Sequence, residues 1–151
     1  MKALITGATS GIGKAIAQEL SRRGVSLILT GRNENALLQM QETLPVHTEI
    51  IALDLAENQA PFTLYEFCKN KHVDILVNNA GLMKRVPMIE MSHTDFLRVI
   101  DVHVGGACNC SKAVLPDMIA KREGKIINIC SMMSELGRET VSAYAAAKGA
   151  L

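Results

Sequence analysis

Short apolar runs alternate with helical patterns along the whole chain, and this alternation limits the possible folds more than any other feature. Each run has the length of a buried strand, and each is followed by a segment with helical periodicity. The runs are Ala3–Thr6, Leu27–Thr30, Ile50–Leu53, Ile75–Asn78 and Ile126–Ile129. Five strands that are each followed by a helix predict a parallel sheet in an α/β fold.

The helices between these strands can be placed from their breakers and caps. One helix should run from Glu34 to Thr43, because a proline follows two residues later. Asn58 should cap the next helix, which has a proline in its first turn. A longer helical stretch leads from Ser92 to Lys121, and Pro116 inside it predicts a kink or a break.

Composition narrows the function classes. A chain of 151 residues with 48% hydrophobic residues can bury one core, so we expect a single domain over residues 1–151. The net charge is +1 and the basic residues are scattered, which predicts neither a nucleic-acid partner nor a membrane surface. The first apolar run begins too close to Met1 for a signal peptide. We therefore expect a cytoplasmic protein whose partners are small molecules and further copies of itself.

The four cysteines carry no recognisable chemistry. Cys68, Cys108, Cys110 and Cys130 form no CxxC pair and have no histidines at metal-ligand spacing. We expect reduced and mostly buried thiols, and no metal site.

A glycine-rich loop joins the first strand to the first helix. It reads Thr6-Gly7-Ala8-Thr9-Ser10-Gly11-Ile12-Gly13. Glycines allow a tight turn and a close approach of the backbone, so free N–H groups at the helix N-terminus can face a phosphate. Turns also need glycine for purely conformational reasons. The strand before the loop and the helix after it favour dinucleotide binding.

Three motifs together resemble the short-chain dehydrogenase/reductase family over all 151 residues. The loop has the form TGxxxGIG, Asn78-Asn79-Ala80-Gly81 follows the fourth strand, and Tyr144 to Lys148 forms YxxxK. The resemblance implies a Rossmann-type doubly wound parallel sheet and a homodimer or homotetramer at full length. It also implies that Asn79 and Ala80 line the cofactor floor, while Asn78 ties neighbouring strands together.

The end of the second strand predicts which nicotinamide cofactor is used. An acidic residue there holds a ribose hydroxyl, whereas an arginine accommodates a 2′-phosphate. This chain has Gly31 followed by Arg32, which favours NADP(H) over NAD(H). Arg32 as a solvated loop residue is the alternative. By resemblance, Asp54 contacts adenine with Leu55 beside it, although Asp54 could instead cap a helix.

Three side chains near the end of the chain predict carbonyl–alcohol chemistry. Tyr144 and Lys148 are four residues apart in an alanine-rich helical segment, so they share one face. A nearby ammonium favours the ionised phenol, which can exchange a proton with a carbonyl oxygen. By resemblance, Ser131 hydrogen-bonds the substrate oxygen. Each residue alone has a plain explanation, as a cap, an interface aromatic or a surface lysine, but the set favours catalysis.

Two departures from the family pattern affect this prediction. His103 stands where many members have an asparagine, at a site where the family's helix is kinked, and we expect it to weaken or retune the proton relay. The chain also stops at Leu151, which predicts a Rossmann domain incomplete at its C-terminus. Such a piece should bind nucleotide but turn over poorly. The alternative function is a non-catalytic nucleotide-binding module, and the substrate stays open.

Overall fold

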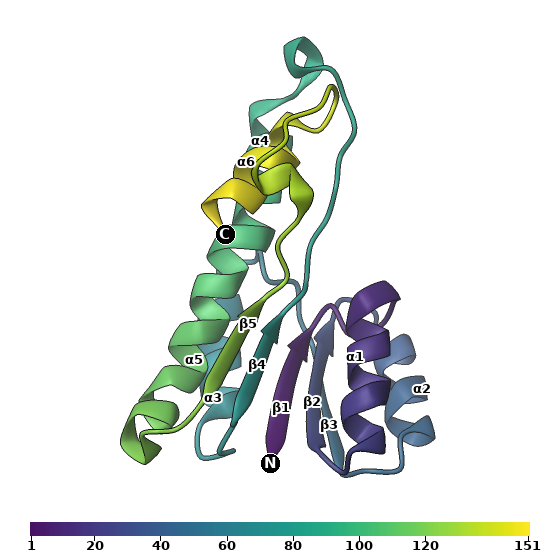
Figure 1. The fold of residues 1–151 in the computed structure, drawn as a ribbon, viewed down its shortest axis with the longest axis vertical. Coiled ribbons are helices and arrows are strands. Elements are labelled where there is room, and N and C mark those ends of the chain that lie inside the picture. Colours follow the sequence, from purple (N-terminus) through teal and green to yellow (C-terminus); the bar gives the residue numbers. More distant parts are fainter.

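The computed structural model describes all 151 residues and contains one parallel sheet with the strand order β3-β2-β1-β4-β5 (Figure 1). The α/β, Rossmann-type fold class is confirmed. The strands are β1 (Lys2–Thr6), β2 (Ser26–Gly31), β3 (Thr48–Ala52), β4 (Ile75–Asn78) and β5 (Lys125–Asn128). The α-helices are α1 (Gly11–Arg22), α2 (Glu34–Thr43), α3 (Ala60–Cys68), α4 (His93–Ile100), α5 (Gly106–Lys121) and α6 (Ser142–Ala150). Short helical turns are η1 (Met88–Glu90), η2 (Asp101–Gly105) and η3 (Met132–Ser134).

The sheet is covered by helices on both faces, and alternate residues of its central strands enter two different cores. Ile5 and Leu29 pack with α1 and α2, whereas Leu4 and Ile28 pack with α3 and α5 (Figure 1). Strands buried on both faces are continuously apolar, which is why they were visible in the sequence. None of the helices is both long and apolar enough to span a membrane.

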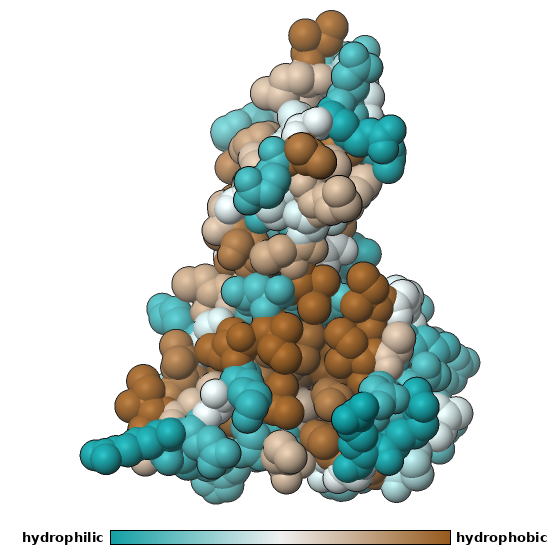
Figure 2. All heavy atoms as spheres, in the orientation of Figure 1, coloured by the Kyte–Doolittle hydropathy of each residue, from teal (hydrophilic) through white to brown (hydrophobic).

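Beyond the carboxyl ends of the strands, α4 and α6 form a separate arm (Figure 1). Its small core contains Val99, Ala143 and Ala147. At the edge of the sheet, β5 is exposed along its length, with Ile126 and Ile127 38% and 45% accessible. Figure 2 shows an apolar area on this side of the molecule, in front of the sheet.

Two boundary predictions were wrong. The third helix has Gln59 as its N-cap and not Asn58, and no side chain caps it. Of the kink or break predicted at Pro116, the break is wrong, because Pro116 lies inside α5. Pro116 is exposed, so water can satisfy the backbone carbonyl that its missing N–H leaves free. The irregularity is instead the π-helical turn η2, which lies between α4 and α5.

The prediction of mostly buried cysteines holds for two of the four. Burial raises the pKa of Cys68 to about 11 and the pKa of Cys110 to about 12, so both are inert thiols. Cys108 and Cys130 are exposed. Cys108 and Cys110 lie two residues apart on α5, so they point to different faces of the helix. Cys110 points inward and Cys108 outward.

Candidate active site

The glycine loop leaves the N-terminus of α1 open. Gly7 and Gly11 have positive φ values of 63° and 51°, which turn the chain sharply from β1 into the helix. Ser10 is the N-cap, yet its side chain caps no N–H group, and the first turn of α1 contains no acidic residue. The free backbone N–H groups and the positive end of the helix dipole can therefore bind an anion.

Gly13 permits the close packing of this loop against the segment after β4. A Cβ atom at Gly13 would lie 2.3 Å from the carbonyl oxygen of Gly7 and 2.5 Å from Nδ2 of Asn79. Nδ2 of Asn79 donates hydrogen bonds to the carbonyl oxygens of Thr6 (3.0 Å) and Gly7 (3.2 Å). Asn79 thus holds the loop in shape from beneath.

Thr6 locks the ends of β1 and β4 together, a role that the sequence did not reveal. Its hydroxyl oxygen accepts from the backbone N–H groups of Asn79 (3.0 Å) and Ala80 (2.8 Å) and donates to the carbonyl of Val77 (3.4 Å). The predicted tie at Asn78 is confirmed, because its Nδ2 donates to Oδ1 of Asn128 across β4 and β5 (2.9 Å).

Replacing Thr6 by valine should lower the free energy of unfolding by about 2 kcal/mol, because the half-buried N–H groups of Asn79 and Ala80 lose their acceptor. Thr30 is the matched control: it pairs with Thr6 in the parallel register and is equally buried, but its hydroxyl has no hydrogen-bond partner. Thr30→Val should change stability little or raise it. Urea denaturation of both variants measures the difference, and equal losses would contradict the assigned role of Thr6.

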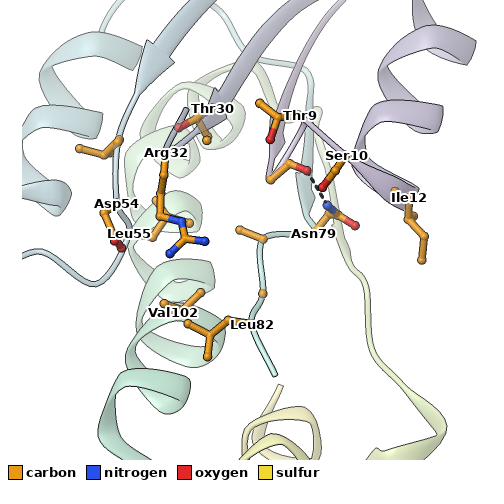
Figure 3. A pocket seen from close by; sticks show the side chains of 16 residues that line it. Thr9, Ser10, Ile12, Thr30, Arg32, Asp54, Leu55, Asn79, Leu82 and Val102 are labelled. Atoms are coloured by element: carbon orange, nitrogen blue, oxygen red, sulfur yellow. Dashed lines mark hydrogen bonds between the residues drawn. The ribbon is translucent and has the colours of Figure 1, made fainter. Parts of the chain in front are cut away.

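A pocket of about 310 Å³ opens at the carboxyl ends of β1, β2, β3 and β4 (Figure 3). Ten predicted cofactor-binding residues line it: Gly7, Thr9, Ser10, Gly11, Ile12, Arg32, Asp54, Leu55, Asn79 and Ala80. Gly13 lies beneath the loop, and neither Tyr144 nor Lys148 lines this pocket. The sequence missed six further lining residues, which are Thr30, Gly31, Leu53, Gly81, Leu82 and Val102.

Charge inside the pocket favours a phosphate. Arg32 points into it from the end of β2, is exposed and takes part in no ion pair (Figure 3). A Cβ atom at Gly31 would already lie 3.3 Å from Thr9, so a larger acidic side chain there would crowd the glycine loop. At the end of β2, the pocket therefore offers a guanidinium without an ion-pair partner and no acidic residue at position 31, the arrangement that accommodates a ribose 2′-phosphate.

Asp54 is held by protein partners at the same end of the pocket. Its carboxylate accepts from the Ala56 N–H (3.1 Å) and pairs with Arg98 of α4. Burial by itself would raise the pKa of Asp54, but these hydrogen bonds and the charges of Arg98 and Arg32 hold that pKa below its usual value. Asp54 is therefore ionised, and it links α4 to the segment after β3.

Tyr144 and Lys148 share one face of α6, as the sequence predicted. Nζ of Lys148 lies 5.7 Å from the centre of the Tyr144 ring and donates to the carbonyl of Ile129. Lys148 is only 5% exposed, so it is not a solvated surface lysine. Burial lowers the pKa of Lys148, and the nearby thiol of Cys130 opposes this effect.

Ser131 begins η3, which packs on α6. Its hydroxyl oxygen accepts from the Met133 N–H (3.2 Å), and the hydroxyl hydrogen has no acceptor within the protein. Oγ of Ser134 donates to the carbonyl of Lys148 (3.0 Å), which ties η3 to α6. Ser134 thus connects the segment after β5 to α6.

His103 lies in the turn η2, so the kink predicted at this site is present as a π-helix. The imidazole is 2% exposed and packs edge-on against Tyr144, with 5.4 Å between ring centres and an angle of 80° between ring planes. The structure therefore brings His103, Tyr144 and Lys148 together on the arm formed by α4 and α6.

Comparison with known proteins agrees with this geometry. The family model for short chain dehydrogenase matches residues 1–151. The 2-dehydro-3-deoxy-D-gluconate 5-dehydrogenase of Formosa agariphila is 39% identical over 99% of this chain, and the gluconate 5-dehydrogenase of Gluconobacter oxydans is 35% identical over 99%. The chain spans 59% and 60% of the lengths of these two relatives.

A solved structure has the same fold. The 3-oxoacyl (acyl-carrier-protein) reductase of Agrobacterium tumefaciens C58, crystallised with NADP bound, superposes with a TM-score of 0.92 and 31% identity. The match covers 99% of this chain and 59% of that one. Together with the glycine loop, the pocket and the Tyr144–Lys148 pair, these matches show that the chain belongs to the short-chain dehydrogenase family.

Proposed function

We propose that the protein interconverts a carbonyl compound and an alcohol by hydride transfer with NADP(H). The observation that carries this proposal is the position of Lys148, a cation buried on the same helix face as the Tyr144 ring. Burying a lysine ammonium costs free energy, so a buried lysine beside a tyrosine marks a candidate functional site. A surface helix that served packing alone would not need one there.

Each part of the proposed reaction can be assigned to particular groups of the protein. When bound, the cofactor supplies or accepts the hydride. The Tyr144 hydroxyl gives a proton to the carbonyl oxygen, or takes one from the alcohol, and Lys148 lies on the same helix face beside the ring. The free hydroxyl hydrogen of Ser131 can donate to the substrate oxygen and share its developing negative charge. The open N-terminus of α1 would hold the pyrophosphate.

Arg32 supports the choice of NADP(H). Changing Arg32 to serine should weaken NADPH binding about 10- to 100-fold, because a charge-assisted hydrogen bond to the 2′-phosphate is lost. NADH binding should change little. Titration calorimetry with both nucleotides measures this, with Arg22→Ser as the control, since Arg22 pairs with Glu19 on the exposed side of α1. An equal loss for both nucleotides would contradict the assignment.

The relatives suggest the substrate class. Two of them are named for gluconate or a deoxy-keto derivative of it, so we propose a sugar acid with a secondary alcohol as the substrate. NADP⁺ reduction should be measured with gluconate, with a steroid alcohol and with a hydroxyacyl thioester. Turnover of gluconate alone supports the proposal. Turnover of the steroid alcohol or the hydroxyacyl thioester in its place would contradict the assignment to sugar acids.

Two further properties stay predictions. We propose that the protein forms a homodimer or homotetramer and that it works in the cytoplasm. Sedimentation analysis of the purified protein tests the first, and fractionation of cells tests the second.

A further inference from the structure

His103 touches three separate segments of the active site. Its ring packs on Tyr144 of α6 and lies in the π-helical turn η2. The ring also fills the space beside Gly81, where an added Cβ atom would lie 2.3 Å from the imidazole Cε1. π-Helical turns are often found at functional sites, because the extra residue re-aims a side chain. Gly81, the last residue of the Asn78–Gly81 motif, therefore leaves the space that the imidazole ring occupies.

The hydrogen bonds of the ring define its charge. Nε2 lies 2.9 Å from the carbonyl oxygen of Leu82 and 3.1 Å from the Leu82 backbone nitrogen. One ring nitrogen can donate to the first or accept from the second, but not both at once. Nδ1 is buried and has no partner. A proton on Nδ1 would be a buried donor without an acceptor, so the geometry favours a neutral ring that donates from Nε2 to Leu82.

No negative charge faces the ring from the elements packed around it. On α6 its neighbours are Tyr144 and the cation Lys148. On α4 the charged side chains are engaged elsewhere, because Arg98 pairs with Asp54 and Asp95 pairs with Lys84.

The other charged side chains also provide no counter-charge to the imidazole ring. Asp101, in the same turn, and Lys112, on α5, are exposed and form no bond to the ring. A protonated His103 would thus be an uncompensated buried cation beside a second one.

We propose that His103 is a positioning residue whose neutral imidazole clamps the Leu82 backbone, at the edge of the cofactor pocket, to Tyr144. A proton on Nδ1 leaves the Nε2 hydrogen bond intact but makes the ring an uncompensated buried cation beside Lys148, which drives the ring out of the clamp and shuts the site in acid. Leu82 lines the pocket (Figure 3), so the clamp connects the cofactor side of the site to the proton donor. The inference rests on the proposed function, in which Tyr144 handles the proton.

The effect on stability has a definite sign. Burial lowers the pKa of His103, the Leu82 carbonyl partly restores it, and the charge of Lys148 lowers it further. The unfolded chain takes up a proton near pH 6.5 while the folded protein does not. The contribution of His103 to stability is therefore complete above about pH 6.5 and is lost as the pH falls towards the lower, folded value.

Nitrogen NMR of the histidine side chains is the direct test, and it needs no variant. The Nε2 of His103 should carry the proton, and the ring should stay neutral through pH 6.5, while the exposed His93 serves as an internal reference. A His103 that titrates at its ordinary pH in the folded protein would overturn the proposal.

The pH profile of kcat tests the functional part. In the wild-type protein kcat should fall about tenfold per pH unit once His103 takes a proton. His103→Asn should remove that acid limb and keep activity within about tenfold at pH 8, since an amide can serve the Leu82 N–H and carbonyl together without titrating. His93→Asn, the control, should keep the limb. An unchanged limb in His103→Asn would refute the clamp.

A third variant separates ring packing from hydrogen bonding. His103→Phe keeps an aromatic edge against Tyr144 but cannot bond Leu82, so kcat should fall about tenfold at every pH, while His103→Asn is spared. If His103→Phe kept its activity while His103→Asn lost it, ring packing alone would explain the site and the clamp would be refuted. If Tyr144 proved dispensable, the proposed function would fail, yet the NMR titration would still decide the state of His103.

Discussion

Replacing Tyr144 by phenylalanine should lower kcat about 10²- to 10⁴-fold and leave the affinity for NADPH unchanged. The substitution removes one oxygen atom, and with it the phenol proton that we propose is passed to the carbonyl oxygen. The ring keeps its contacts with His103 and Lys148, so the fold of the arm should survive. Tyr144 does not line the cofactor pocket, which is why binding should persist.

Tyr65→Phe is the matched control for this change. Tyr65 is the other tyrosine of the chain; it lies on α3 and is 42% exposed. NADPH absorbance gives kcat, and quenching of NADPH fluorescence gives affinity, for both variants. A Tyr144→Phe protein that retains wild-type kcat would show that another group moves the proton, and a loss shared by Tyr65→Phe would point to general instability.

The second large effect is expected at Gly13. A Gly13→Ala substitution should lower the free energy of unfolding by about 3 kcal/mol and abolish nucleotide binding. The added methyl group would lie 2.3 Å from the Gly7 carbonyl oxygen, and that oxygen belongs to backbone that cannot move aside without distorting the loop. Asn79, which braces the loop, lies in the way on the other side.

Gly105→Ala controls for the general effect of removing a glycine from a helical segment. Gly105 has helical dihedral angles (φ −58°, ψ −49°) and open space around its Cβ position. This variant should be as stable as the wild type, or more stable by up to about 1 kcal/mol, because alanine is the better helix former. Urea midpoints and NADPH titrations separate the two substitutions. Similar behaviour of both would mean that the loop is looser than its geometry implies.

Local sequence patterns predicted several strands, one helix and the shared face of two site residues. The apolar runs of β1, β2 and β4 stood out because both faces of these strands are buried, and Glu34–Thr43 was placed correctly because its boundaries are set by nearby residues. The spacing of Tyr144 and Lys148 fixed their common face, since helix geometry needs no tertiary information.

The errors in the predicted elements arose where residues distant in the sequence decide how an element begins or continues. Pro116 breaks no helix, because its place on the solvent side lets water satisfy the backbone, and exposure is not written in the local sequence. Ile50–Leu53 was predicted two residues late at its start, because β3 begins where its pairing with Leu27 begins, at Thr48. Register is set by the neighbouring strand.

The sequence by itself thus determined the order of strands and helices, the open glycine loop, Arg32 at the end of β2 and the shared face of Tyr144 and Lys148. Only the tertiary structure decided that Thr6 bonds the segment after β4, that Asp54 is held by Arg98, and that Nε2 of His103 lies against the Leu82 backbone. The physical reason is the range of the interactions: periodicity, capping and turn conformation act within a few residues, whereas burial, hydrogen-bond partners and charge come from segments that meet only in the folded chain.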